Sequence, residues 1–492
     1  MTTFHGFTRS VTAVGLLLLA GCAAGPDYRR PDLPQMDYLP APVDAAMRDE
    51  QEIVDADLPA QWWTLFHSQA LDDLVRGALA RSPSVAAAQA ALRQATEIRR
   101  AQQAAFLPTV DASYAASRQK IASPLASPLA SNADVFNLST AQLNVSYTPD
   151  LFGLNRRQVE SLQGQEQAQR WNVEATYLTL SSNLVVAAIT EASLHAQFEA
   201  TAKQVALQSD VLARFRELQR LGENSELDVS QQEAQLASLQ AALPGLYKQL
   251  AQQRDLVKAL AGLPPSATGV RELRLEDLTL PDPLPLTLPS TLVEHRPDVL
   301  AAEAALKSAS ADIGVAVANR LPQVTLGVNS WGSSAASLSG LFSPGTAFWT
   351  LAGSATQPLV DGGALKHKEA AARAAYDQAE ATYRGTVINA FQNIADALQA
   401  VQADAEAERA TRRAFDISEH TLEIGRRQLD LGDVSAVAVI QVEQSRQQAL
   451  LVAIQAKAQR LSDAAALLQA LGGGWWNRAG ESASTPTRAP AD

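Results

Sequence analysis

Apolar residues recur every three or four positions over two long stretches of the chain, and neither stretch contains a proline. At about 154–220 the apolar stripe includes Val173, Tyr177, Leu180, Leu184, Leu194 and Phe198, and at about 363–430 it includes Val387, Phe391, Ile394, Leu398 and Val401. A 3.5-residue repeat sustained over this length predicts supercoiled helices that pack along their neighbours. At 1.5 Å per residue each helix would reach about 100 Å, which exceeds a globular core.

Shorter helices are predicted around these two. Segments rich in alanine and leucine, with a helical pattern, lie at about 69–106, 226–261, 290–319 and 435–471. The chain is 47% hydrophobic but only 5% aromatic, and Ala and Leu carry most of the hydrophobic share. This composition favours long, closely packed helices, so the predicted fold class is mainly α.

Four segments interrupt the helical pattern with alternating apolar and polar residues. They lie at about 109–118, 136–148, 323–331 and 347–357. A length of about ten residues with one apolar face is typical of a tilted membrane strand. A soluble four-stranded sheet is the alternative. Aromatic residues near the strand ends favour the membrane, because interfacial girdles lie there; they are Tyr114, Tyr147, Trp331, Phe342, Phe348 and Trp349.

Four membrane strands in one chain predict an oligomer. An open sheet edge in lipid leaves backbone groups unpaired, at a cost on the order of several kcal/mol each. Two chains would give eight strands, whose interior side chains would fill, whereas three chains would give twelve strands around a water-filled lumen. The long helices would continue the same ring as a helical tube.

The chain carries this arrangement twice. Pro83 and Pro297 open similar alanine-rich segments 214 residues apart, and Gly222 recurs as Gly432 after 210 residues. An offset of this size marks a duplicated architectural unit rather than a short solenoid repeat. The assigned regions are repeat 1 at 61–262, a proline-rich linker at 263–289, repeat 2 at 290–472 and a polar, disordered tail at 473–492.

The first 21 residues have the pattern of a signal peptide, with Arg9 before an apolar run of about ten residues. The run ends in Leu-Ala-Gly-Cys, which resembles a bacterial lipobox, so Cys22 is the predicted lipidation site, bearing an S-diacylglycerol and an N-acyl group. A transmembrane anchor is the alternative, but the run is shorter than the roughly 20 residues needed to span. Residues 22–60 are proline-rich and predicted to be extended. Ala23 stands where an Asp would retain a lipoprotein at the inner membrane, which indicates the outer membrane.

Composition and motifs exclude several classes of function. The net charge of −12 argues against nucleic acid as a partner. Cys22 is the only cysteine, so an intrachain disulfide and a thiolate metal cluster are excluded. No nucleophile, zinc-protease or phosphate-loop motif is present, and the six histidines are scattered. We therefore predict no enzyme activity, no metal and no cofactor other than the covalent lipid.

The duplicated repeat, the lipobox, Trp62-Trp63-x-x-Phe66, the Leu-Pro before each first strand and the Leu-Gly-x-x-Ser turns together resemble the TolC-like outer membrane efflux proteins, most of all their lipoprotein (NodT-type) branch. The resemblance covers about residues 60–475. It implies a trimer with a 12-stranded outer membrane β-barrel, a 12-helix periplasmic α-barrel and a belt near the linker. It also implies an exit duct of a tripartite pump, joined by a periplasmic adaptor to an inner membrane transporter of the resistance–nodulation–division type.

Two turns carry the residues that the resemblance makes functional, as tips that meet the adaptor and close the duct. Gly222 and Gly432 are suited to ending a helix in a left-handed conformation, and the serines three residues later are suited to capping the next helix. The predicted tip residues are Leu221, Gly222, Ser225, Asp228, Leu431, Gly432 and Ser435.

Asp228 falls on the family's gate position, and Ala438 departs from it in repeat 2. Asp228 has two open interpretations. Mutual repulsion of three carboxylates in a trimer could raise their pKa and attract cations. Ser225-x-x-Asp228 also fits a capping box, which would make the carboxylate structural. Arg216, Arg220, Arg426 and Arg427 could pair across the tips, but solvated helix faces are the simpler expectation.

The sequence thus predicts a passive efflux duct whose cargo it does not reveal. The same duct serving type I protein secretion is one alternative. A lipid-anchored coiled-coil scaffold without a pore is another, although a scaffold has no use for four alternating strands of membrane length.

Overall fold

The computed structural model describes residues 24–31, 58–122, 134–269, 271–280 and 293–478. The predicted signal peptide and Cys22 lie outside the described residues, as does most of the extended segment predicted at 22–60. The chain divides into two compact units. Unit 1 comprises Met1–Asp32, Ala91–Arg170 and Ala301–Arg384; unit 2 comprises Leu33–Ala90, Trp171–Leu300 and Gly385–Asp492.

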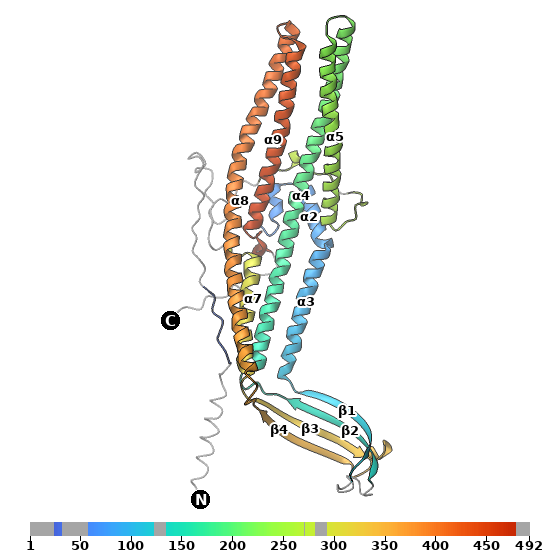
Figure 1. Ribbon diagram of the computed structural model, residues 1–492, viewed down its shortest axis with the longest axis vertical. Helices are drawn as coiled ribbons and strands as arrows, with labels where there is room; N and C mark the ends of the chain where they lie inside the picture. The colour runs from blue at the N-terminus through green and yellow to red at the C-terminus, as the bar shows by residue number, and fades with distance from the viewer. Residues whose placement is uncertain (1–23, 32–57, 123–133, 270, 281–292, 479–492) are drawn as a thin grey trace. The chain divides into compact units, whose positions relative to one another are not determined.

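Unit 1 contains one antiparallel sheet in the order β1-β2-β3-β4 (Figure 1). Its strands are β1 (Thr109–Lys120), β2 (Val135–Tyr147), β3 (Gln323–Ala335) and β4 (Ala347–Thr356), with the short helix η5 (Ser339–Phe342) between the last two. Each strand is joined at one end to a helix by a short connection. Strand β1 follows α3 (Pro83–Gln103) and η3 (Ala104–Phe106), and β2 leads into α4 (Leu154–Arg220). Strand β3 follows α7 (Pro297–Ala318), and β4 leads into α8 (Ala364–Leu431). Strands and helices thus follow each other in the predicted order in both repeats.

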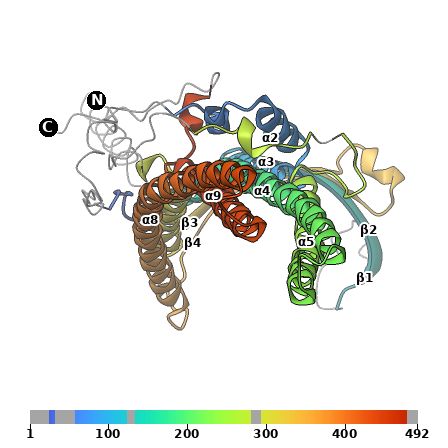
Figure 2. The ribbon, with the colours of Figure 1, turned by 90° about the horizontal axis from the view of Figure 1, so that it is seen from above.

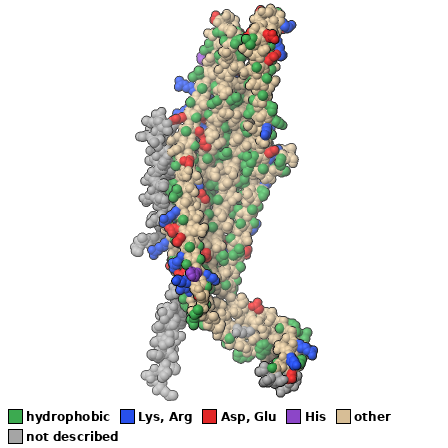
Figure 3. Space-filling view, in the orientation of Figure 1, with side chains coloured by type: hydrophobic (Ala, Val, Ile, Leu, Met, Phe, Trp, Pro, Cys, Tyr) green, Lys and Arg blue, Asp and Glu red, His purple; other side chains and the backbone are tan. Residues whose placement is uncertain are grey.

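One face of the sheet is apolar across all four strands. Val110 pairs with Val145, Val145 with Val328, and Val328 with Leu351. Because side chains alternate along a strand, partners in register share a face. The apolar face therefore also carries Tyr114, Leu143, Tyr147, Leu326, Trp331 and Trp349, all of which are exposed. The basic side chains of the sheet, Arg118 and Lys120, lie at the end of β1 that is farther from the helices (Figure 3).

A β-bulge keeps this face continuous. The register of β3 shifts between Val328 and Ser330 against β4, and β2 shifts at the same level. Without the extra residue, Ser330 would follow Val328 on the apolar face and Trp331 would lie on the polar one. With it, Trp331 pairs with Leu143 on one side and Trp349 on the other. The sequence pattern did not predict the bulge.

Close helix contacts hold the rest of unit 1. A Cβ on Gly164 of α4 would lie 2.8 Å from the Ser308 backbone nitrogen of α7, so the two backbones approach at a contact that only glycine permits. The Ser161 and Ser308 hydroxyls hydrogen-bond at 3.0 Å beside it. Glu166 of α4 pairs with Arg99 of α3 and accepts a hydrogen bond from Thr96 at 2.8 Å. Helix packing here depends on small residues and polar pairs.

Unit 2 contains α2 (Gln69–Arg81) and two helical hairpins, in which α5 (Glu226–Leu260) returns along α4 and α9 (Ala436–Ala470) returns along α8 (Figure 1). Seen from above, α9 lies between α8 and α4 (Figure 2). Gln447 of α9 donates to the Ala200 carbonyl of α4 at 2.9 Å, and Arg460 of α9 pairs with Glu408 of α8 at 2.6 Å. Of the helices described, α4 alone is long and apolar enough to cross a membrane, but half of its apolar window is buried against protein.

The single helix predicted at 69–106 is wrong, because it is broken at Pro83. Helix α2 ends at Arg81, and α3 begins at Pro83 itself. Ser82 between them is extended (φ −63°, ψ 123°), as steric conflict with a following proline ring requires. The Ser82 hydroxyl accepts the Val85 N–H at 3.5 Å, so the break is a capped helix start with proline at its first position.

The predicted disorder at 473–492 is also wrong in its first six residues. Trp475 donates its indole N–H to the His295 carbonyl at 2.7 Å, and its ring contacts that of Trp171 at a tilt of 58°, with centroids 4.9 Å apart. Arg478 forms two hydrogen bonds to Glu174, at 3.0 and 2.9 Å. Aromatic contacts and a bidentate ion pair therefore extend the ordered chain past the last helix. Residues from 479 onward lie outside the described ones.

The described part of the proline-rich linker packs against the hairpins. Leu273, Leu275 (in η4, Leu275–Asp277) and Leu278 are buried. Arg254 of α5 bridges Glu272 of the linker, at 2.6 Å, and Glu191 of α4, at 3.3 Å. Burial raises the pKa of Glu191, although Arg254 opposes the shift. These contacts make the described residues 271–280 of the linker part of unit 2.

Candidate functional site

The two hairpin tips have the same backbone construction. In the first, the Gly222 N–H donates to the Gln219 carbonyl at 3.0 Å and the Glu223 N–H to the Leu218 carbonyl at 2.9 Å. In the second, Gly432 and Asp433 repeat these bonds at 3.0 and 2.9 Å. This is a Schellman motif, and it requires positive φ at the glycine, which is +83° and +81°.

The serines start the returning helices. Ser225 Oγ accepts the Asp228 N–H at 3.2 Å, and Ser435 Oγ accepts the Ala438 N–H at 3.3 Å. Only the first tip has the reciprocal bond: the Asp228 carboxylate accepts the Ser225 N–H at 3.0 Å and its hydroxyl at 2.7 Å. The capping box is therefore formed, and these hydrogen bonds lower the pKa of Asp228. Within one chain the shift is opposite in sign to the one that mutual repulsion would produce.

Apolar side chains at the tips face solvent. Leu221 and Leu431, which directly precede the glycines, are 65% and 77% exposed. Leu227 and Val437, in the first turns of the returning helices, are 67% and 43% exposed. The tips thus present apolar surface around a rigid turn. The structure brings the tip residues of each repeat together as the sequence predicted.

Each tip is braced by an ion pair between its two helices. Arg216 of α4 pairs with Glu233 of α5 at 2.6 Å, and Arg426 of α8 pairs with Glu443 of α9 at 2.9 Å. The two pairs are equivalent, since both partners are 210 residues apart. Arg216 and Arg426 thus form the pairs that the sequence offered as one possibility, on helix faces that remain exposed, as the simpler expectation had it. A 17-residue spacing across a known turn was the signal that could have found the partners.

A second polar cluster lies farther down the α8–α9 hairpin, and sequence reasoning missed it. Asp404 of α8 faces Asp463 of α9, which also accepts a hydrogen bond from Gln459 at 2.9 Å. Arg460 lies beside the pair but directs Nη1 to Glu408 at 2.6 Å. Burial first, then the hydrogen bond and charge of Asp463, raise the pKa of Asp404 to about 7. The neighbouring carboxyl of Asp463 thus favours the protonated form of Asp404.

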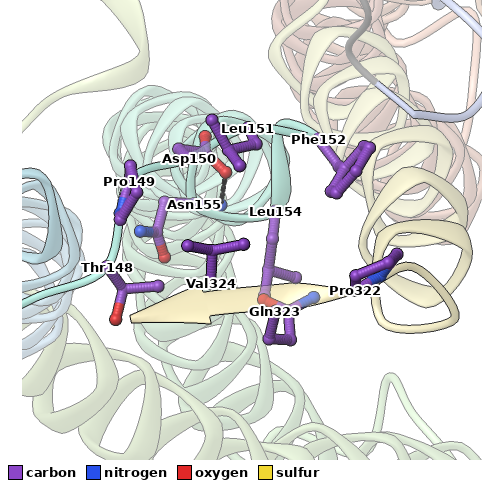
Figure 4. A pocket seen from close by; sticks show the side chains of 10 residues that line it. All are labelled: Thr148, Pro149, Asp150, Leu151, Phe152, Leu154, Asn155, Pro322, Gln323 and Val324. Carbon is purple, nitrogen blue, oxygen red and sulfur yellow. Dashed lines mark hydrogen bonds between the residues drawn. The ribbon is translucent and has the colours of Figure 1, made fainter. Parts of the chain in front are cut away.

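Two aspartates cap helices at the strand ends in unit 1. The Asp150 carboxylate accepts the backbone N–H of Asn155 at 3.1 Å and of Arg156 at 2.9 Å, within the turn that leads from β2 to α4 beside the start of β3 (Figure 4). Asp361 accepts the N–H of Gly363 at 2.8 Å and of Leu365 at 2.7 Å, and these bonds lower its pKa. Both aspartates therefore cap the helices that follow the strands.

Among the described residues, no group of three or more His, Cys, Asp or Glu is arranged to hold a metal ion. The acidic pair at Asp404 is accompanied by arginine rather than by further ligands. The exposed apolar side chains of the tips suit recognition of a partner surface.

Comparisons with known proteins agree on one family. The sequence model of the family "Outer membrane efflux protein" matches residues 74–263 and 288–473, which fall on the two repeats. The chain is 29% identical over 435 residues to the pyoverdine export outer membrane protein OpmQ of Pseudomonas putida, covering 88% of this chain and 90% of that one. It is 28% identical over 477 residues to the probable efflux pump outer membrane protein TtgC of the same species, covering 95% and 96%.

Solved structures agree as well. The outer-membrane channel OprN superposes with a TM-score of 0.81 at 25% identity, covering 92% of this chain and all of that one. The outer membrane protein VceC of Vibrio cholerae superposes with a TM-score of 0.75 at 26% identity, covering 85% and 100%. The mainly helical fold with a small sheet is thus that of known outer membrane channels.

Proposed function

Because this chain belongs to the outer membrane efflux protein family, we propose that it is the exit duct of a tripartite efflux pump. Three copies would join their sheets into a 12-stranded barrel and their hairpins into a 12-helix periplasmic tunnel. The duct would be passive, with energy supplied by an inner membrane transporter.

The sheet carries this proposal. It has a continuous apolar face across four strands, yet β1 and β4 each have a strand partner on one side only within the described chain. In lipid such edges would leave N–H and C=O groups without partners. Pairing β4 of one copy with β1 of the next removes both edges and closes a ring, whereas a scaffold without a pore leaves the apolar face unexplained.

The tips support a docking role. Exposed leucines around a rigid Schellman turn, repeated in both hairpins, suit contact with a periplasmic adaptor protein. Adaptor binding to a splayed arrangement of the tips would shift the population from shut to open. Asp228 would add up to three carboxylates at the shut end. The inner membrane partner proposed is of the resistance–nodulation–division type.

Cys22 is the proposed site of lipid attachment, after removal of residues 1–21. Acyl chains contribute about 0.8 kcal/mol per buried methylene, so a triacylated cysteine would stay in the membrane. The chain would then be both anchored by lipid and inserted by its strands.

Small molecules are the proposed cargo. Relatives are named for export of pyoverdine and for efflux of toluene and antibiotics. These names favour small-molecule efflux over type I protein secretion, the remaining alternative. No described residue selects among cargoes.

Single-particle imaging of the detergent-extracted protein tests the duct directly. A hollow three-fold particle supports it, whereas slender rods without a lumen contradict it and favour the scaffold. A matched pair of variants tests the lipid face. Leu143→Arg places a charge on the apolar face, at a cost of about 2–4 kcal/mol near the bilayer midplane, and should abolish membrane assembly. Gln142→Arg, on the polar face of the same strand, should assemble normally.

A further inference from the structure

The chain segment that follows Cys22 packs against α4 and α7 of unit 1, and we call the residues that it contacts there the seat. The Ala24 N–H donates to the Phe152 carbonyl at 3.0 Å, at the turn between β2 and α4. Farther along, Tyr28 donates its hydroxyl to Glu303 of α7 at 3.4 Å, and Arg30 pairs with the same carboxylate at 3.2 Å. Burial and the Glu303 charge raise the pKa of Tyr28, so its hydroxyl stays a donor. The segment is therefore held at both ends.

A buried arginine lies at the centre of this seat. The Arg157 side chain is 5% exposed. Its guanidinium donates to the carbonyls of Ala24 at 3.1 Å and Gly25 at 3.4 Å. It also pairs with Asp27 at 2.9 Å and Glu160 at 2.7 Å. If the segment left, three of these four partners would go with it, and a buried cation with one partner is costly.

Two glycines make the close approach possible. Gly25 has φ +91°, and a Cβ there would lie 2.5 Å from the Cα of Gly314 on α7. A Cβ on Gly314 would lie 2.7 Å from Arg157 Cγ and 2.8 Å from the Ala24 carbonyl. Neither position admits a side chain without displacing the backbone opposite. We call Arg157, Gly25 and Gly314 the clasp.

We propose that the clasp is a positioning device that pins the lipid-bearing end of the chain to the β2–α4 turn. Only Ala23 lies between Cys22 and Ala24, so an acyl group would join the chain within about 7 Å of the Ala24 amide. The acyl chains and the strands then enter the bilayer at the same height along the membrane normal. The lipid anchor would thereby determine how deeply the strands are inserted. The inference that lipid and strands enter the bilayer at the same height rests on the proposed lipidation, whereas the packing of the segment in its seat does not.

Hydrogen exchange of the Ala24–Arg30 peptide in the full-length, membrane-extracted protein tests the seat. Arg157→Gln and Gly25→Ala should each speed exchange about tenfold or more, as expected for loss of hydrogen bonds to a charged group or of the close contact. Arg156→Gln is the matched control, because Arg156 is the exposed neighbour. Gly345→Ala is the second, because Gly345 has φ +88° with nothing within 4 Å of a Cβ. If the variants match their controls, the clasp is refuted. Should Arg157→Gln fail to fold, Gly25→Ala decides, since Gly25 lies outside the helices.

The distance of the N-terminal segment from the lipid headgroups distinguishes a positioning role of the clasp from a purely stabilising one. A fluorophore on Arg29→Cys, reconstituted with headgroup-nitroxide lipids, should be quenched with the intact clasp. Adding Arg157→Gln should lower the quenching by about half or more, because the released segment swings away from the headgroups. Unchanged quenching overturns the positioning role.

The mass of the N-terminal peptide distinguishes the two proposals. An unacylated Cys22 with normal three-fold particles overturns the inference that lipid and strands enter the bilayer at the same height, but it does not contradict the proposed duct. Acylated protein that forms rods instead contradicts the duct while the clasp measurements stand.

Discussion

The hairpins α4–α5 and α8–α9 share their tips but differ in how their middles are held together. At the tips the Schellman bonds, the serine caps and the Arg–Glu braces recur with a 210-residue offset. Farther down, the first hairpin buries Leu250 to 3% exposure and places Phe198 against Tyr247 with ring centroids 6.3 Å apart. In the second hairpin, the positions equivalent to Leu250 and Phe198 carry Arg460 and Glu408, an ion pair.

This difference shows which parts of a duplicated architecture are constrained by geometry. A helix reversal needs a left-handed residue and a partner for the first N–H groups, and few residues supply them. The interior of a helix pair needs only complementary surfaces, which apolar or ionic side chains can both provide. The two hairpins should therefore respond in opposite ways to pH, because one has an acid at its tip and the other a carboxyl pair in its middle.

The largest effect should come from the apolar middle of the first hairpin. Leu250→Ala removes a buried side chain and should lower the stability of the hairpin by about 2–5 kcal/mol. Hydrogen exchange of the α5 amides measures this. Leu256→Ala, in the same helix but 46% exposed, is the control and should have a much smaller effect. Equal effects at both positions would show that the apolar packing of this hairpin does not hold it.

The carboxyl pair should make the second hairpin less stable as pH rises. The folded-state pKa of Asp404, about 7, lies above its ordinary value of 3.8, so the folded protein binds more protons between these values. Its stability should therefore fall as pH rises through this window, on the order of 1 kcal/mol once solvent screening is considered. Asp404→Asn should remove that dependence in urea unfolding at pH 5 and pH 8. Asp433→Asn, an exposed tip control, should keep it. A wild-type stability that rises over this interval contradicts the assignment.

The caps should matter less, and unequally. Ser225→Ala and Ser435→Ala each remove an N-cap, at a cost of about 1 kcal/mol. Ser225→Ala also disturbs Asp228, whose lowered pKa means that its contribution is present near neutral pH and lost as pH falls below its ordinary range. Exchange of the first-turn amides of α5 and α9, at pH 7 and pH 3.5, compares the two tips. The same acid response in both tips would rule out a special role for the capping box.

The smallest structural effect should come from making the tips alike. Ala438→Asp should complete a second capping box and stabilise α9 by a few tenths of a kcal/mol at low salt. In the proposed duct it would also double the acidic residues at the shut end, so planar-bilayer recordings should show greater cation preference. Asp228→Ala should reduce that preference. If neither variant changes it, Asp228 acts only as a cap.

The strands show how far a sequence pattern reaches. Alternation at 109–118 and 136–148 predicted which side chains share a face, because the period of a strand is two wherever the backbone is regular. The bulge between Val328 and Ser330 escaped prediction, since one inserted residue looks like an ordinary break in the alternation. Only the pairing of Trp331 with Leu143 and Trp349 reveals why the extra residue is there.

The tips and the clasp divide in the same way. Local chemistry determined the turns, because Gly222, Ser225 and Asp228 interact with residues only a few positions away. The break at Ser82–Pro83 is local too, because the proline ring acts on the residue directly before it. The partners of Arg157 and Asp404 lie 130 and 59 residues away along the chain. Such contacts depend on which helix faces pack together, so only the tertiary structure could decide that Arg157 binds the N-terminal segment and that Asp404 lies beside Asp463.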